Sequence, residues 1–177
     1  MTTSLHVRPD SSEYAAYYEP YVAGVPDGDV VDVLREGGRE LMTALAAIPE
    51  ERGGHRYAEG KWSIREVIGH LIDAERIFSY RALWIARGDA TPLPGFEEKD
   101  FVRTAGSDAR TLASLLAELR AVRESSVRLF QSLPEEAWTR RGVASGNGVS
   151  VRALVYIVAG HSAHHLRVLR ERYGVGS

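Results

Sequence analysis

The chain has 177 residues, of which 44% are apolar and 26% charged, and a formal net charge of −2. This length allows one domain with its own core, and the composition is that of an ordinary soluble globular protein. Because cysteine is absent, disulfides, thiolate metal ligands and a cysteine nucleophile are excluded. Lys and Arg are scattered among Asp and Glu, so we expect no nucleic-acid partner.

The sequence predicts a single cytoplasmic domain over residues 1–177. The N-terminus lacks a signal peptide's basic start and apolar core, and the longest wholly apolar run, residues 153–160, is too short to cross a membrane. We therefore expect no membrane partner. Residues 1–27 are expected to form an irregular arm that packs its tyrosines on the domain, with a substrate-lining role as the alternative. These tyrosines are Tyr14, Tyr17, Tyr18 and Tyr21.

The first long helix is expected to begin after Asp27 or Asp29, either of which can cap free backbone N–H groups, and to stop at Pro49. Its apolar residues keep a helical period. The pair Gly37-Gly38 interrupts that period and indicates a bend or a close contact with another helix.

The second helix has a clear start. Ser63 is followed three residues later by Glu66, the spacing of a capping box, and Gly88 marks the end of the helix. His70 falls on the edge of its apolar stripe, so an ionisable group lies at or beside the core.

Residues 89–106 are predicted to be a long connection, because Pro92 and Pro94 force extended backbone at the residues before them. Loops of this length in compact domains are usually functional. Two alternatives stay open, that the loop covers the mouth of a pocket or that it packs over the end of the helices.

The third helix is expected from Ser107 or Asp108 to Leu133, and the last from the cap Ser150 to Gly174. Between them we expect a short helical turn after Pro134 and a turn-rich linker over residues 142–148. No segment shows a convincing alternation of apolar and polar residues, which is the pattern that indicates a β-strand. The charged residues on the other faces of the third helix are expected to be solvated: Arg110, Glu118, Arg120, Arg123, Glu124 and Arg128.

Four helices of about 20–25 residues predict an all-α four-helix bundle, with the long connection between helices two and three. The order of the helices in the bundle does not follow from the pattern.

The last helix carries the most informative residues. His161 and His165 lie about 40° apart around the helix axis, one turn from each other, and both continue its apolar stripe. Burying an unpaired imidazole costs on the order of 1–3 kcal/mol, and a metal ion would satisfy both rings. The alternative is a pair of core histidines bonded to hydroxyls such as those of Tyr156 or Ser162. His164 points to the other side and is expected to be a flanking residue.

His70 would complete a site of three nitrogens with an open position, which is typical of a catalytic metal. Glu75 shares a helix side with Leu71 and Phe78, so it is expected to turn inward as ligand orienter, general base or extra ligand. The alternative is a surface ion pair, with a neighbouring helix or with Arg76 or Arg81. The Glu-x-x-His spacing of di-iron bundles and the His-Glu-x-x-His spacing of zinc proteases are absent from the sequence. It also has no glycine-rich loop of the kind that binds phosphate.

Two stretches together resemble the DinB/YfiT-like superfamily. They are Lys61-Trp62-Ser63-Ile64-Arg65-Glu66-Val67-Ile68-Gly69-His70-Leu71 and Gly160-His161-x-x-His164-His165. The resemblance covers roughly residues 28–173. It implies a four-helix bundle with the helices in an unusual crossed order and a divalent metal held by His70, His161 and His165.

The resemblance also implies an activity. Characterised members include thiol-dependent S-transferases and isomerases, so the resemblance implies a metal-dependent thiol S-transferase, with a low-molecular-weight thiol as cosubstrate and a small electrophile as substrate. A metal-dependent hydrolase and a non-enzymatic metal- or ligand-binding stress protein are the alternatives. Three imidazoles suit Zn, Ni, Fe or Cu, of which Zn and Ni are expected. Homodimerisation is a further implication.

Overall fold

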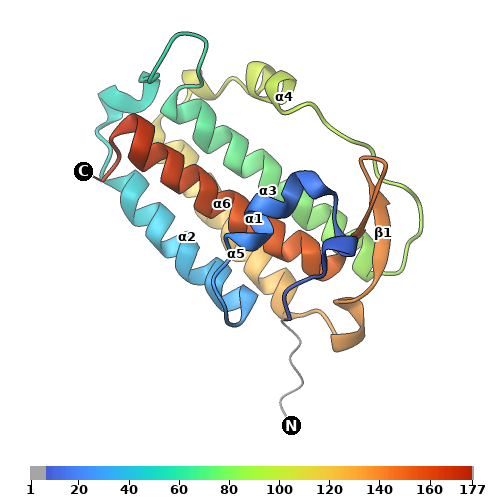
Figure 1. Cartoon of the computed structure of the whole chain (residues 1–177). Coiled ribbons are helices and arrows are strands. Elements are labelled where there is room, and N and C mark those ends of the chain that lie inside the picture. Colours follow the sequence, from blue (N-terminus) through green and yellow to red (C-terminus); the bar gives the residue numbers. More distant parts are fainter. Residues whose placement is uncertain (1–6, 177) are drawn as a thin grey trace.

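The computed structural model describes residues 7–176, and its centre is a bundle of four long helices (Figure 1). This confirms the expected all-α four-helix bundle. The histidine at position 6 lies outside the described residues. Within the described range, no helix combines the length and the apolar character needed to cross a bilayer. The four helices are α2 (Val30–Ala46), α3 (Ile64–Ala86), α5 (Leu112–Gln131) and α6 (Val151–Tyr173).

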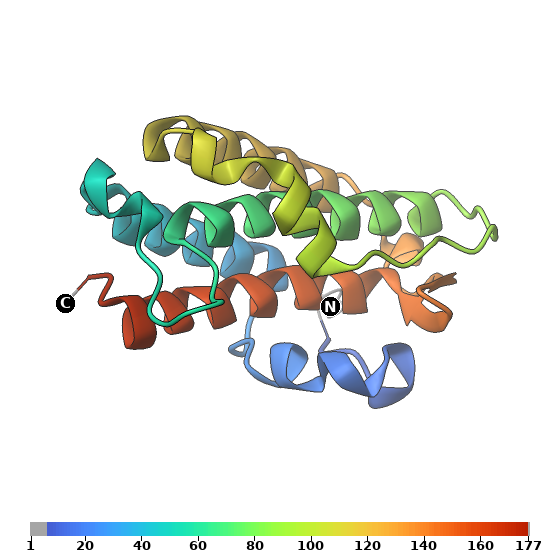
Figure 2. The same cartoon turned by 90° about the horizontal axis from the view of Figure 1, so that it is seen from above.

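The helices are packed in a crossed order. α3 lies against α5 and α6, and α2 lies against the same two helices (Figure 2). Helices that follow one another in the sequence, α2 and α3 or α5 and α6, therefore lie diagonally across the bundle. This order makes direct neighbours of α3 and α6, which are distant in the sequence.

Side-chain caps explain where three of the helices begin. The Asp29 carboxylate accepts a 2.8 Å hydrogen bond from a backbone N–H in the first turn of α2. Ser63 and Glu66 form the expected capping box at α3, with bonds of 3.0 and 2.8 Å. The Ser150 hydroxyl caps α6, which ends at Gly174 with a left-handed φ of 64°. These predicted boundaries are confirmed.

α5 begins later than predicted. Ser107–Ala109 form a separate 3₁₀ turn (η4), Arg110 is extended with φ −103° and ψ 155°, and the Thr111 side chain caps the helix at Leu112. The extended residue breaks the helical hydrogen bonding, so the two segments are distinct although their sequence reads as one. A further 3₁₀ turn, η5 (Glu135–Ala137), stands where the short helical turn was expected.

The connection between α3 and α5 is not only loop, because it contains a helix, α4 (Glu98–Ala105). The Glu97 side chain caps its start, and Gly106 ends it with a left-handed φ of 66°. Only Val102 of this helix is buried. The segment lacks the apolar period that identifies a helix from sequence, so α4 was missed within the long connection that the sequence predicted.

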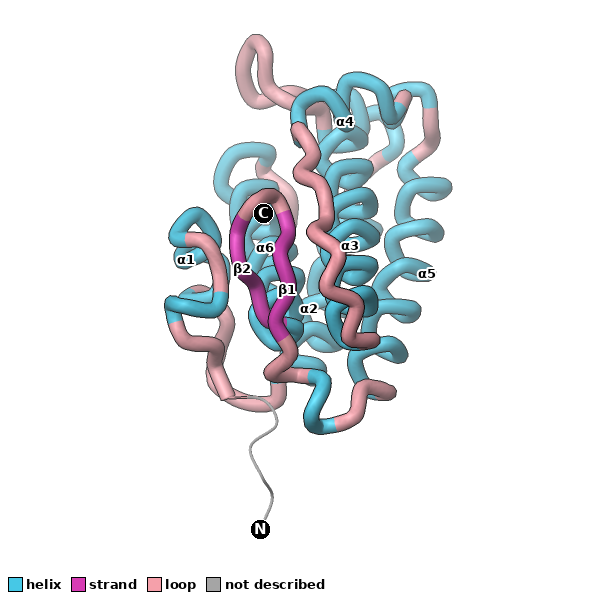
Figure 3. The backbone as a smooth tube through the Cα atoms, turned by 90° about the vertical axis from the view of Figure 1, so that its right-hand side faces the viewer, coloured by secondary structure: helices cyan, strands magenta, loops and turns pink. Residues whose placement is uncertain are grey.

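The predicted linker over residues 142–148 is a β-hairpin. Strands β1 (Arg141–Ala144) and β2 (Asn147–Ser150) pair antiparallel around a two-residue turn, in which Ser145 and Gly146 have φ of 52° and 75°. Strands of only four residues are too short to show the alternation of apolar and polar residues that would identify them from the sequence. Leu93 exchanges two backbone hydrogen bonds with this hairpin, of 2.9 and 3.1 Å, so residues 89–97 run along it (Figure 3).

The N-terminal arm is more ordered than expected. It contains two 3₁₀ turns, η1 (Ser11–Glu13) and η2 (Ala16–Tyr18), and a short helix, α1 (Glu19–Ala23), which lies across α6. Arg152 at the start of α6 donates a 2.7 Å hydrogen bond to the buried Glu13 carboxylate. Burial alone would raise the pKa of Glu13, but hydrogen bonds from Arg152 and Ser150 lower it to about 2.

Two glycines allow close packing of the chain. A Cβ at Gly160 would lie 2.0 Å from the carbonyl oxygen of Tyr21, so α1 rests directly on the α6 backbone. A Cβ at Gly38 would lie 2.7 Å from a guanidinium nitrogen of Arg123, whereas one at Gly37 would meet nothing within 4 Å. α2 is continuous through both glycines, and Gly38 makes the close contact that the pair predicted.

Replacing Gly160 with Ala should lower the free energy of unfolding by about 1–3 kcal/mol, because the new methyl group must push α1 off α6. Gly37→Ala is the matched control within another helix, where open space and better helix propensity predict a gain of up to about 1 kcal/mol. Urea denaturation of both variants measures the effect. Equal stability of the Gly160→Ala variant and the parent would contradict this packing.

Candidate metal centre

Three histidines meet where α3 packs on α6. His70 comes from α3, and His161 and His165 come from successive turns of α6. The Nε2 atom of His161 lies 3.0 Å from Nε2 of His70 and 3.1 Å from Nε2 of His165. Within residues 7–176 this is the one group of three or more His, Asp or Glu side chains whose ligand atoms all lie within 4.8 Å.

The three rings are neutral near pH 7. Burial lowers the pKa of His70 to about 4, and burial together with the neighbouring His70 and His164 lowers that of His165 to about 3. The pKa of His161 lies well below the usual value, because the ring is buried and lies beside His165, His70 and His164. Neutral imidazoles keep a free lone pair on one nitrogen, which is the state that binds metal.

The donor set fits a divalent ion better than it fits mutual hydrogen bonding. A neutral Nε2 carries either one hydrogen or one lone pair, so His161 cannot pair well with both of its neighbours. A tetrahedral ion with Zn–N bonds of 2.0–2.1 Å holds its nitrogens about 3.3 Å apart. The observed 3.0 and 3.1 Å need only a slight outward movement of the rings.

Aromatic rings enclose the histidines. The Trp62 ring lies 4.9 Å from that of His70, and the rings of Tyr21 and Phe78 lie 5.5 and 6.1 Å from that of His161. Tyr21 therefore packs the N-terminal arm on α6, as expected, with its ring beside that of His161.

One side of the cluster opens to the surface. A cleft of about 610 Å³, here called the histidine cleft, is lined by His164 and His165 and by the rings of Tyr57, Trp62 and Tyr173. Of the three clustered histidines only His165 reaches it. His164 stands outside the cluster, half-buried, with its Nδ1 atom 3.2 Å from an Arg167 nitrogen.

Glu75 is buried, and it is bound to Arg123 instead of lying in the histidine group. Arg123 Nε donates 2.8 and 3.1 Å hydrogen bonds to the two carboxylate oxygens, and Nη2 donates a third, of 2.9 Å. Of the expectations for this carboxylate, the structure shows an ion pair with a neighbouring helix, inside the core instead of at the surface. The prediction that Arg123 is solvated was wrong, because only 8% of this residue is exposed.

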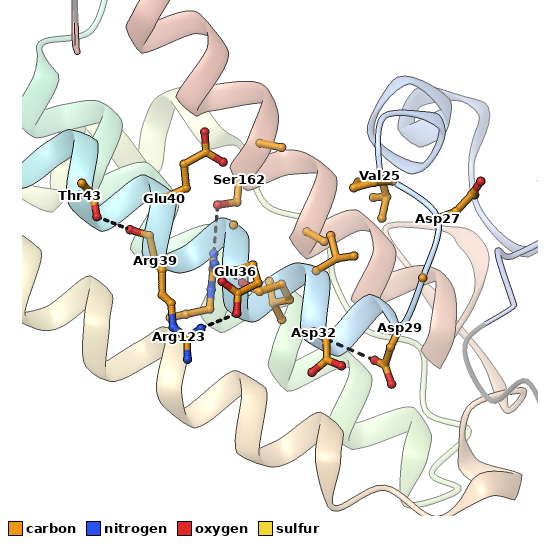
Figure 4. Close-up of a pocket in the computed structure, with 17 residues that line it drawn as sticks. Val25, Asp27, Asp29, Asp32, Glu36, Arg39, Glu40, Thr43, Arg123 and Ser162 are labelled. Carbon is orange, nitrogen blue, oxygen red and sulfur yellow. Dashed lines mark hydrogen bonds and ion pairs between the residues drawn. The ribbon is translucent and has the colours of Figure 1, made fainter. Parts of the chain in front are cut away.

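Arg123 joins all four bundle helices. Besides Glu75 on α3, its guanidinium donates 3.0 Å hydrogen bonds to the Leu34 carbonyl on α2 and to the Ser162 hydroxyl on α6. The bond to Ser162 is drawn in Figure 4, at the base of a groove of about 700 Å³ between α2 and α6. Leu119 and Val127, four residues to either side, are both buried. That spacing places position 123 on the apolar stripe and is the signal that identifies it.

Arg123→Met should lower the free energy of unfolding by about 3–5 kcal/mol, because it leaves the Glu75 charge buried without a partner. Adding Glu75→Leu should recover most of this loss, since replacing both charges by apolar groups is close to neutral. Urea denaturation of the two single variants and the double variant gives the coupling. Losses that simply add in the double variant would show that the pair is not coupled.

Comparison with known proteins shows which family this chain belongs to. Residues 34–169 match the family model of the DinB superfamily. A protein of Geobacillus thermodenitrificans named "Putative metal-dependent hydrolase" is 25% identical over 149 residues, which cover 81% of this chain and 84% of that protein. A relative from Bacillus licheniformis with the same kind of name is 28% identical over 149 residues, or 80% of this chain and 83% of its own.

The fold matches a solved structure more completely. YfiT from Bacillus subtilis, described as "a probable metal-dependent hydrolase with an unusual four-helix bundle topology", superposes with a TM-score of 0.74 at 18% identity, covering 95% of this chain and 94% of its own. This likeness shows that the two chains share a fold. With most of its length matched by the family model, the chain belongs to the DinB superfamily.

Proposed function

We propose that this protein is a metal-dependent hydrolase in which His70, His161 and His165 hold a divalent ion. The observation that carries the proposal is the convergence of three neutral, largely buried imidazole nitrogens with no carboxylate among them. The names of the relatives support the same reaction class. A three-nitrogen site leaves a position for water or substrate, and an ion held there lowers the pKa of its water and polarises a carbonyl or phosphoryl oxygen.

The remaining residues have supporting roles in this proposal. Trp62, Phe78 and Tyr21 exclude water from the imidazoles and keep them neutral. For Glu75 we propose a positioning role instead of the catalytic one expected from sequence, since Arg123 occupies both of its oxygens. Through Arg123 and Ser162, Glu75 holds the turn of α6 that carries His161.

A thiol S-transferase is the second candidate. The chain has no cysteine, so a reacting sulfur must come from a small molecule, and a divalent ion at the histidines would hold it as thiolate. A structure of a mycothiol-dependent maleylpyruvate isomerase shares the fold, with a TM-score of 0.68 at 14% identity over 84% of this chain and 60% of its own. The non-enzymatic alternative is weakened, because Glu75 does not block the cluster.

His161→Ala should lower the affinity for Zn or Ni by more than about 100-fold. Removing a residue that only hydrogen-bonds to a metal ligand already costs about 10–100-fold in affinity, and removing the ligand itself should cost more. His164→Ala, three residues along the same helix, is the matched control and should bind metal as the parent does. Elemental analysis of untagged protein after dialysis against each metal measures the content. Parental metal content in the His161→Ala variant would remove the site.

Turnover separates the two reaction classes. A panel of model esters, amides and phosphate esters should be hydrolysed by the metal-loaded protein without added thiol, and chelation or His161→Ala should abolish the rate. Consumption of an electrophile only when a low-molecular-weight thiol is present would instead establish the transferase. No metal-dependent turnover under either condition would contradict both.

A further inference from the structure

Lysine is used at only two positions in this chain. The sequence has 22 basic Lys and Arg residues, and all are arginine except Lys61 and Lys99. Both lysines line the histidine cleft, beside His165. Lys61 lies in the loop before α3 and Lys99 lies in the first turn of α4, so two separate segments bring the same rare residue to one cleft.

The cleft continues past the lysines. A second hollow of about 370 Å³ shares Lys61, Lys99 and the Trp62 ring with the histidine cleft, and adds Arg56 and Arg103. The resulting groove runs from His165, between the loop before α3 and helix α4, to the surface. Four cationic side chains line it in all, with Glu66 as the acidic lining residue.

The two arginines and the two lysines differ in their partners. Arg56 is bound to Glu66 and, at 2.7 Å, to Asp108, and Arg103 lies 3.0 Å from Asp100. Among residues 7–176 neither lysine ammonium has a carboxylate within ion-pair distance. The Lys61 Nζ atom lies 5.9 Å from the centre of the Tyr57 ring. The unneutralised charge of the groove therefore comes from the lysines.

A solvated lysine is ordinary on a protein surface, but the placement of these two is selective. Elsewhere the chain uses arginine, both in its core pairs and on its outer faces. Lysine differs from arginine in being a compact point charge on a flexible stem, suited to reaching an anion that enters from solvent. A groove lined by one sign of charge also concentrates ligands of the opposite sign.

We propose that Lys61 and Lys99 bind an anionic oxygen group, a carboxylate or a phosphate, of the small molecule that reacts beside His165. The position of the reacting bond rests on the proposed function, whereas the anion site rests on the lysines alone. The substrate would lie along the groove, with its charged end between the two ammonium groups and its apolar part against Trp62 and Tyr57. This arrangement also gives α4 a function, since α4 carries Lys99.

The rarity of lysine allows a direct test. Reductive ¹³C-methylation of the full-length protein gives two dimethyl-lysine signals beside that of the terminal amine, and Lys61→Gln and Lys99→Gln assign them. Titration with inorganic phosphate and, separately, with malonate should shift both lysine signals together. A shift with phosphate alone identifies a phosphate ester as the substrate class, and a shift with malonate alone identifies a carboxylate.

Calorimetry on the same proteins gives the size of the effect. Each lysine substitution should weaken binding of the effective anion by at least about threefold, the double substitution by about tenfold or more, and added salt should weaken it further. Arg87→Gln, which removes one positive charge beyond the end of α3, is the matched control and should leave the affinity unchanged.

The test of the anion site does not depend on whether the histidines bind a metal. Shifts that persist in the His161→Ala variant place the anion on the lysines and not on an ion at the histidines. Lysine signals that stay unmoved by both anions up to about 50 mM, where a millimolar Kd would saturate, overturn the anion site even if metal binding and hydrolysis are found. The reverse result, shifted lysines in a protein that binds no metal, leaves the anion site and removes the hydrolase.

Discussion

The packing of α3 on α6 is the constraint on which the candidate site depends. It places the Nε2 atoms of His70 and His165 about 3 Å from Nε2 of His161, inside a core that keeps the rings uncharged. Neutral rings facing one another satisfy their hydrogen-bonding capacity poorly. In the crossed order of the bundle α3 and α6 are direct neighbours. This packing therefore brings the three histidines together and also leaves their nitrogens without good hydrogen-bond partners, which a metal ion would replace.

The buried Glu75–Arg123 pair links this packing to the rest of the bundle. Taking two charges out of water is costly, and it is offset here by hydrogen bonds that reach Leu34 and Ser162 as well. The arginine also needs the empty space left by Gly38 on α2. One side chain thus links all four helices next to the turn of α6 that carries His161.

Local signals in the sequence predicted the elements well and their assembly less well. The caps at Asp29, Ser63 and Ser150 and the stripe positions of the histidines depend on neighbouring residues, and the structure agrees with them. α4 was missed because only Val102 of it is buried, and the hairpin was missed because each strand has only four residues. Arg123 was predicted to be solvated because it is charged, although its spacing to Leu119 and Val127 places it on the apolar stripe; its buried partner lies 48 residues away. The groove beside His165 is lined by Lys61 from the loop before α3 and Lys99 from α4, and no pattern in the sequence indicates that these two segments lie together.

The central claim is that three imidazoles from two helices hold one divalent ion. X-ray absorption at the metal edge of the zinc- or nickel-loaded, untagged protein tests it most directly, because imidazole rings give a distinctive multiple-scattering pattern. We expect three imidazole nitrogens at about 2.0–2.1 Å, and two when His165 is replaced by Ala. A coordination shell made of oxygen atoms, or one unchanged by that substitution, would contradict the account.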